Sequence, residues 1–273
     1  MLTVRRAARW AALVLAAAFF LPAALADSAS AVWPEAGSKT KKAGKLVVDS
    51  SHMEDGYILC RIKKASKHRL KLRITKGKET MTYDLNNRGN DEVFPLQLGS
   101  GKYSVVLFEN VTGKKYSQEG KANLNVKLTR EDAAYLVPNQ YVNYEIAFEA
   151  VKKSDELTAG KKDETDRYRA VCEFVKSTFL YDFIRAATVS AGMLPDIEGA
   201  YKKKMGICQD LSAITCCMLR VAGLPGRLVI GYADKQYHAW TVTKIGDKEY
   251  FFDPTAAIAA IGKVKNYTVE RMY

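Results

Sequence analysis

The hydrophobic period of the chain changes after about residue 128, and this change constrains the fold more than any other feature. From about residue 56 to residue 128, apolar residues alternate with polar ones in short runs separated by turn signals. Short alternating strands at this spacing predict a β-sandwich. After residue 165, helical spacing comes first and strand-like runs follow. We therefore expect an α+β protein: an N-terminal β-sandwich, then a domain whose helix packs on an antiparallel sheet.

Turn residues set the expected boundaries. We assign residues 51–128 to the sandwich, 129–164 to a helical connector and 165–273 to the second domain. The strands expected in the sandwich are Tyr57–Cys60, Leu70–Thr75, Thr80–Leu85, Tyr103–Phe108 and Leu124–Leu128. In the second domain we expect helices over Arg167–Phe179 and Cys208–Ala222, and strands over Leu228–Tyr232, Tyr237–Thr243 and Glu249–Asp253.

The N-terminus has the layout of a secretory signal peptide. Three arginines among the first nine residues precede an apolar run from Trp10 to Ala24, and Ala24-Leu25-Ala26 offers small residues for cleavage near Ala26. The apolar run is shorter than the ~20 residues that span a bilayer, which makes an uncleaved anchor the weaker alternative. We expect residues 1–26 to be removed, residues 27–50 to form a flexible basic linker, and the protein to be secreted or held at the cell surface.

The formal net charge of +12 indicates which kinds of partner the protein can attract. Outside the cytoplasm, a basic protein is attracted to anionic surfaces such as cell-wall polymers or phospholipid headgroups. Export argues against nucleic acid as a partner. The same charge can also serve solubility alone.

The chain has five cysteines: Cys60, Cys172, Cys208, Cys216 and Cys217. Export permits disulfides, but an odd number leaves at least one thiol unpaired within the chain. We expect all except Cys208 to be buried as small apolar residues. The sequence has no metal-ligand cluster, and we expect no metal or organic cofactor.

Cys208 follows the motif Met205-Gly206-Ile207. Gly206 permits a sharp turn into the helix, which places Cys208 in the first helical turn. The helix dipole and the free N–H groups there favour a thiolate, and the same groups can stabilise an oxyanion.

His238 and Asp253 come from the hairpin that follows this helix. With a two-residue turn at Gly246-Asp247, counting outwards places Trp240 opposite Asp253 and His238 diagonal to it on the same face, roughly 7 Å away between Cβ atoms. A carboxylate can cover that gap, bind the ring N–H and support the imidazolium. A cysteine or histidine alone would most simply be structural. The three together favour a nucleophilic site over coincidental core residues or a decayed site.

Several segments resemble bacterial transglutaminase-like proteins over about residues 165–256. These segments are Gly206–Ser212, Met218–Arg220, Ala222–Pro225, Gly231-Tyr232, Tyr237–Trp240 and Asp253–Thr255. Two further segments, Phe94–Leu96 and Pro138–Tyr144, are similar to exported members from Gram-positive bacteria. The resemblance implies a papain-like fold with Cys208 as the nucleophile, His238 as the base and Asp253 as the orienting acid.

The chain departs from the family pattern at two places. Leu211 stands where an aromatic residue is frequent, and Thr241-Val242-Thr243 replaces a segment that carries Asn and an acidic residue in many relatives. These changes bear on substrate preference more than on the triad. Tyr181 and Gln209 are both candidates for the second oxyanion donor. Trp240 either shields the His–Asp bond from water or packs in the core.

The resemblance implies thiol-mediated acyl transfer on protein or peptide amides. Water as the acceptor makes the enzyme a peptidase or amidase, and an amine makes it a crosslinking enzyme. The resemblance favours hydrolysis, although both reactions use the same triad. The alternative is a non-catalytic cell-surface or wall-binding protein with a relic papain-like domain.

Overall fold

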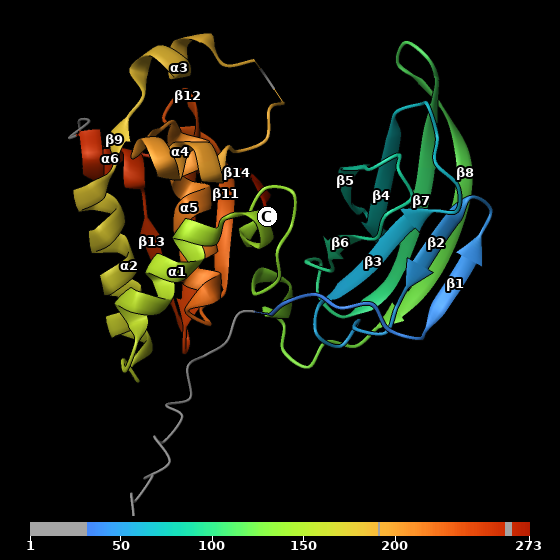
Figure 1. Ribbon diagram of the computed structural model, residues 1–273, viewed down its shortest axis with the longest axis horizontal. Coiled ribbons are helices and arrows are strands. Elements are labelled where there is room, and N and C mark those ends of the chain that lie inside the picture. Colours follow the sequence, from blue (N-terminus) through green and yellow to red (C-terminus); the bar gives the residue numbers. More distant parts are fainter. Residues whose placement is uncertain (1–31, 191, 260–263) are drawn as a thin grey trace, which may run out of the picture.

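The computed structural model describes residues 32–190, 192–259 and 264–273. These residues form a β-rich N-terminal lobe and a mixed C-terminal lobe, joined by a connector (Figure 1). The expected signal peptide, residues 1–26, lies outside the described residues. Within the described ranges, no helix is long and apolar enough to cross a membrane.

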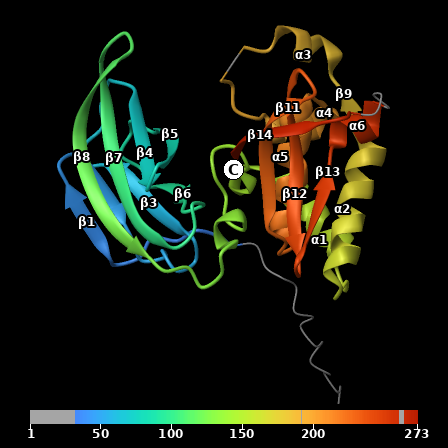
Figure 2. The same cartoon turned by 180° about the vertical axis from the view of Figure 1, so that it is seen from behind.

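The N-terminal lobe is a sandwich of two antiparallel four-stranded sheets, as predicted (Figures 1 and 2). The first sheet has the order β1-β2-β3-β6, with β1 Thr40–Ala43, β2 Leu46–Asp49, β3 Tyr57–Ile62 and β6 Glu92–Pro95. The second has the order β5-β4-β7-β8, with β5 Glu79–Leu85, β4 Leu70–Lys76, β7 Gly101–Thr112 and β8 Lys115–Val126. Alternation fills the space between the sheets: Leu70, Leu72 and Ile74 of β4 are buried while Arg73 is exposed.

The expected linker over residues 27–50 is wrong for residues 40–49, which form β1 and β2. Leu46, Val47 and Val48 are buried. This apolar run is only three residues long and follows four nearby lysines, so the basic composition of the segment favoured the prediction of a linker over that of a strand. The sandwich therefore begins near Thr40 rather than at residue 51. Strand β6 was also not predicted, because four residues are too few to show a period.

The connector is less helical than expected. A 3₁₀ turn at Ala133–Tyr135 replaces the helix predicted to start at Thr129, because Pro138 follows too soon for a longer helix. A second 3₁₀ turn at Tyr144–Ile146 precedes α1, Phe148–Thr158. The chain then enters the C-terminal lobe at α2, Glu164–Thr178.

The C-terminal lobe is an antiparallel sheet of order β13-β12-β11-β14 covered by helices (Figure 2). Its strands are β11 Gly226–Ala233, β12 Gln236–Ile245, β13 Lys248–Phe252 and β14 Tyr267–Met272. Its further helices are α3 Phe183–Thr188, α4 Ile197–Lys203, α5 Cys208–Val221 and α6 Pro254–Ala259, and a parallel pair joins β9 Leu180–Tyr181 to β10 Met205–Gly206. Strand β14 was not predicted, because its side chains are mostly exposed and show no apolar alternation.

Helix α5 lies at the centre of this lobe, between the sheet and helices α1, α2 and α4. Every residue from Asp210 to Val221 is buried. The Arg220 guanidinium is fully buried and donates to the carbonyl oxygens of Gly226 at 2.9 Å, Val137 at 2.6 Å and Tyr273 at 2.9 Å. One side chain thus joins α5 to β11, the connector and the chain after β14.

The two lobes meet around Tyr273. This side chain is buried, stacks on Tyr141 of the connector at 3.6 Å between ring centroids, and meets Tyr83 of β5 edge-on at 6.4 Å. Gln97 after β6 also donates a hydrogen bond to the Met272 carbonyl. The sandwich therefore packs against the end of β14.

We predict that Arg220→Lys lowers the free energy of unfolding by about 3 kcal/mol, because an ammonium cannot reach all three carbonyls and each hydrogen bond from a charged donor is worth ~1.5–3 kcal/mol. Urea denaturation would measure the change. Arg88→Lys is the matched control, since Arg88 is exposed in the sandwich. An unchanged midpoint for Arg220→Lys would contradict the structural role of the guanidinium.

Candidate active site

Cys208 is the first residue of α5 and is half-buried. The N–H groups of a first helical turn have no partner inside the helix, and the positive end of the dipole lies there. The predicted placement of Cys208 at a helix start is confirmed. The thiol thus lies where a negative charge on sulfur, or on an oxygen bound beside it, is stabilised.

Asp210 fixes the approach to this helix. Its buried carboxylate accepts the N–H of Ile207 at 3.0 Å and the N–H of Asp196 at 2.8 Å, and it pairs with the Arg185 guanidinium. Burial raises the pKa of Asp210, although these donors act in the opposite direction. Sequence reasoning quoted Asp210 only as part of the motif. Its position three residues after the N-cap residue Ile207 lets the carboxylate reach back to the Ile207 N–H, as the acidic residue of a capping box does, although Ile207 has no side-chain acceptor to complete the box.

A glycine is required at position 206 for a different reason from the one predicted. It lies in β10, and its φ angle is outside the left-handed region that favours glycine. A Cβ at this position would lie 3.0 Å from the Asp210 Cβ and 3.1 Å from the Ala200 Cβ. The sharp-turn interpretation is therefore wrong, and the glycine instead makes room for Asp210 and α4 beside the helix start.

His238 and Asp253 meet as the hairpin count predicted. Strands β12 and β13 pair Ile245 with Lys248 and Val242 with Phe251. Strand β13 ends at Phe252, so Asp253 is not a strand residue but the residue before α6. Its Oδ1 accepts the Ala256 N–H at 3.0 Å, while its Oδ2 lies 2.8 Å from His238 Nε2.

The His238–Asp253 pair is buried, with relative exposures of 8% and 6%. Burial alone lowers the pKa of His238, but interactions with Asp253 and Cys208 outweigh it and raise the pKa to about 9. Burial also raises the pKa of Asp253, and the His238 ring, the Ala256 N–H and the Tyr267 hydroxyl reverse this and lower the pKa overall. The pair therefore favours an imidazolium next to a carboxylate.

The structure brings Cys208, His238 and Asp253 together. Asp253 occupies Nε2 of the ring, and interaction with the Cys208 thiol contributes to the raised pKa of His238. Nδ1 is the ring nitrogen left for the thiol proton. A thiol, an imidazole and a carboxylate in this arrangement are able to carry out thiol-based acyl transfer.

Three auxiliary residues were predicted, and the structure places each near the triad. Trp240 is buried and nearly parallel to the His238 ring, with 6.3 Å between centroids. Tyr181 lies in β9 opposite Gly206, and burial together with the charges of Cys208 and Asp253 raises its pKa to about 12. The Gln209 Nε2 is buried with no hydrogen-bond partner among the described residues.

Sequence reasoning missed Tyr267 of β14. Its hydroxyl donates a hydrogen bond to Asp253 Oδ2 at 2.9 Å. The sequence did not indicate Tyr267, because it lies beyond the motif residues and belongs to a strand that the hydrophobic pattern did not predict.

The other four cysteines are free and buried, as expected. Burial raises the pKa of Cys172 and of Cys216 to about 12, and it raises the pKa of Cys60 and of Cys217 as well. Cys208 differs from them, because its thiol is partly exposed.

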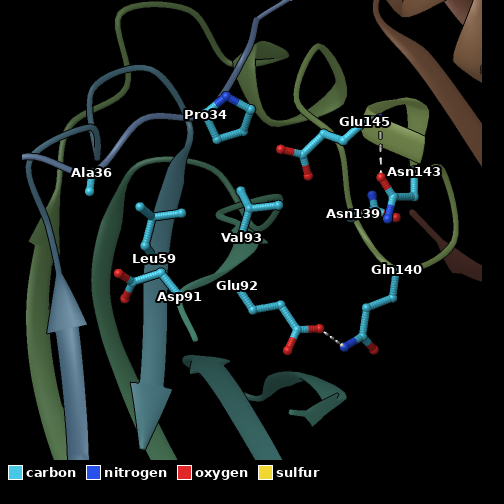
Figure 3. A pocket seen from close by; sticks show the side chains of 10 residues that line it. All are labelled: Pro34, Ala36, Leu59, Asp91, Glu92, Val93, Asn139, Gln140, Asn143 and Glu145. Carbon is cyan, nitrogen blue, oxygen red and sulfur yellow. Dashed lines mark hydrogen bonds between the residues drawn. The ribbon is translucent and has the colours of Figure 1, made fainter. Parts of the chain in front are cut away.

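A pocket of about 270 Å³ lies elsewhere, between the sandwich and the connector (Figure 3). Its wall includes Asp91, Glu92, Asn139 and Gln140, and none of the triad residues. Figure 3 shows the Gln140 amide directed at the Glu92 carboxylate, and Gln140 Nε2 lies 2.5 Å from Glu92 Oε1. These polar groups join the connector to β6.

We predict that His238 makes the stability depend on pH. Its folded-state pKa of about 9 lies above the ordinary 6.5, so its stabilising contribution is complete below pH 6.5 and is lost as the pH rises through 9. Relative to His238→Gln, the free energy of unfolding of the wild type should fall over that window. Urea denaturation from pH 6 to pH 9.5 measures it, with the exposed His68→Gln as the control. If the free energy of unfolding depended on pH in the same way in the wild type and in His238→Gln, the raised pKa of His238 would be contradicted.

Comparisons with known proteins agree with this geometry. Residues 151–254 match the family model of the transglutaminase-like superfamily. No curated protein matches the chain.

The solved structures that match this chain resemble it only weakly in sequence identity and in TM-score. A candidate cysteine protease from Cytophaga hutchinsonii is 15% identical with a TM-score of 0.40, covering 80% of this chain and 83% of its own. The periplasmic domain of TgpA from Pseudomonas aeruginosa is 14% identical with a TM-score of 0.37, covering 83% and 96%. The family match and the geometry of the site lead to one conclusion: residues 151–254 form a domain of the transglutaminase-like superfamily, and the chain has the character of a cysteine enzyme.

Proposed function

We propose that this protein is an exported cysteine enzyme that transfers acyl groups from amides of protein or peptide substrates. The observation that carries the proposal is the buried His238–Asp253 hydrogen bond of 2.8 Å beside a half-buried Cys208 at the start of α5. Each part alone has a structural explanation, but the combination of nucleophile, base and orienting carboxylate does not.

The proposed reaction has two steps. The Cys208 thiolate attacks the amide carbonyl carbon, and the C–N bond breaks as the His238 imidazolium gives its proton to the departing amine, which leaves a thioester. Water then attacks the thioester carbonyl. His238 takes a proton from this water, a carboxylic acid forms, and the Cys208 thiolate leaves, which restores the thiolate–imidazolium pair. Asp253 holds the ring by Nε2 and supports its positive charge during both steps.

The oxyanion of each step needs donors. We assign the first to the Cys208 N–H, since the first turn of a helix leaves this group free. Tyr181 is the proposed second donor. It pairs with Gly206, two residues before Cys208, and burial together with the charges of Cys208 and Asp253 raises its pKa, so its hydroxyl keeps a proton to donate. The Gln209 amide is the alternative, but its Nε2 is buried and would have to turn towards the substrate.

Apolar side chains beside the site favour a peptide substrate. Leu180 is 66% exposed, Phe183 66% and Ile184 82%, and all three belong to β9 and α3 next to Tyr181. Exposed apolar groups of this kind bind substrate side chains. We propose water as the main acceptor, and transfer to an amine shares every step up to the thioester.

A second proposal concerns binding. On the sandwich, Lys63, Lys64 and Lys67 are among the residues that line a hollow of about 440 Å³, next to Lys45, whose ammonium pairs with Glu109 and Glu119. Such a group of cations attracts anionic polymers or phospholipid headgroups. This favours an anionic cell-wall or membrane surface as a partner, whether the C-terminal lobe is an active enzyme or a relic.

We predict that Cys208→Ala abolishes acyl transfer and labelling by iodoacetamide near neutral pH, without loss of folding. His238→Ala should nearly abolish activity because it removes the base. Asp253→Asn should retain more activity than His238→Ala, because it disturbs the tautomer of the His238 ring but leaves the base in place. Losses of activity up to ~10⁴-fold nevertheless occur in such triads. Fluorescent iodoacetamide with peptide mapping, and mass spectrometry of products with and without added amines, measure the labelling and the acceptor.

Cys216→Ala and Cys217→Ala are the controls, since both thiols are buried within the same helix. They should keep the activity and show only a modest loss of stability. If iodoacetamide labelled mainly Cys216 or Cys217 and left Cys208 unmodified, the enzyme proposal would be wrong, and the non-catalytic binding protein would be the remaining proposal.

For export, we predict that the mature protein begins at Asp27, because small residues at Ala24 and Ala26 follow the apolar run. N-terminal sequencing of the protein from the culture medium or cell surface would show it. A protein that begins at Met1 would rule out cleavage.

A further inference from the structure

We infer that Tyr267 is a positioning residue of the site, which holds the Asp253 carboxylate in the orientation that His238 requires. The family match ends at residue 254, so Tyr267 lies outside it, on β14. The inference rests on the proposed function and adds a fourth residue to the hydrogen-bonded chain of the triad.

Three donors hold the Asp253 carboxylate. The Tyr267 hydroxyl donates to Oδ2 at 2.9 Å, and the same oxygen lies 2.8 Å from His238 Nε2. The other oxygen, Oδ1, accepts the Ala256 N–H at 3.0 Å. Donors at both oxygens fix the plane of the carboxylate. Without the hydroxyl, the orientation of the carboxylate would depend on two bonds alone, from the ring to Oδ2 and from the Ala256 N–H to Oδ1.

Aromatic packing and the strand hold Tyr267 in turn. Its ring meets Trp240 at 5.0 Å and Phe251 at 4.7 Å between centroids, edge to face. Main-chain bonds between Asp234 and Asn266, and from the N–H groups of Lys265 and Asn266 to the Asp234 carboxylate, fix the residues just before the strand. The hydroxyl is therefore directed at Asp253 by packing on two sides.

Close approach of β14 to β11 depends on Gly231. This residue pairs with His238 on one side, and on the other a Cβ would lie 1.9 Å from the Thr268 carbonyl oxygen. The strand register shifts between Ile230 and Gly231. The absence of a side chain at Gly231 thus lets β14 approach closely enough for Tyr267 to reach the triad.

The ionisable groups near this hydroxyl are Asp253, which accepts its hydrogen bond, and Asp234, which lies in the turn after β11 and bonds the residues just before β14. His238 lies beyond the Asp253 carboxylate and interacts in turn with Cys208. Burial, the bond to Asp253 and the charge of Asp234 raise the pKa of Tyr267. The hydroxyl thus keeps its proton and donates across the pH range of the enzyme. Its loss would weaken the support that Asp253 gives the imidazolium, and a thiolate paired with that imidazolium would form less readily.

The test compares the rate of Cys208 alkylation by iodoacetamide against pH in the wild type and in Tyr267→Phe, together with the pKa of His238 by NMR in a Cys208→Ala background. We expect Tyr267→Phe to lower the alkylation rate near pH 6 by about tenfold, the lower end of what one hydrogen bond to a charged group is worth. The lower inflection of the profile should move to higher pH, and the pKa of His238 should fall. Melting temperature checks the fold.

Two further variants separate the hydroxyl from the ring. Tyr232→Phe is the matched control, since Tyr232 lies in β11 opposite Thr268, packs on Tyr237, and should leave the profile unchanged. Tyr267→Leu removes the ring as well. A normal profile and His238 pKa in Tyr267→Phe, whether or not Tyr267→Leu is impaired, would overturn the inference. If His238→Gln alkylates like the wild type, the proposed function fails, and the inference fails with it.

Discussion

Burial of helix α5 from Asp210 to Val221 is the constraint on which the C-terminal lobe depends. Polar side chains in this buried part have to find partners inside the protein, because an unmet buried donor or acceptor costs ~1–3 kcal/mol. Arg220 does so through three carbonyls, and Asp210 through two N–H groups and a guanidinium. Ser212 donates to the Ala239 carbonyl and accepts at its own carbonyl from Thr241. These bonds decide which segments surround the helix.

The same bonds place the reacting groups. At the first turn, Asp210 fixes the chain that leads into Cys208 and ties down the segments carrying Arg185 and Asp196. In the middle of the helix, Ser212 bonds β12 immediately after His238. At the last turn, Arg220 holds the residue that follows β14, the strand that carries Tyr267. The nucleophile and both supports of the base are therefore set by contacts of one helix.

Much of the site could be predicted, because it follows from local rules. A two-residue turn and a period of two gave the correct pairing of β12 with β13, and a glycine after the apolar run gave the end of α5. The sequence could not show Asp210 as the residue that fixes the helix start, or Tyr267 as a partner of Asp253. Both depend on contacts between segments far apart in the chain. Strands β1, β2, β6 and β14 were missed for a related reason: each is too short, too lysine-rich in its surroundings or too exposed to stand out in the sequence, and partners elsewhere in the fold stabilise them.

The buried groups also show how far the functional unit extends. The family match covers residues 151–254, but two of the three acceptors of Arg220 belong to Val137 and Tyr273, outside both ends of that range. A domain cut at these limits would leave a buried guanidinium with one carbonyl, which is a severe cost in a low-dielectric interior. It would also expose the Asp253 carboxylate on the side that Tyr267 covers. The connector and β14 are therefore parts of the C-terminal lobe, and since the sandwich packs on Tyr273, whose carbonyl accepts from Arg220, contacts run from the sandwich to the helix that carries Cys208.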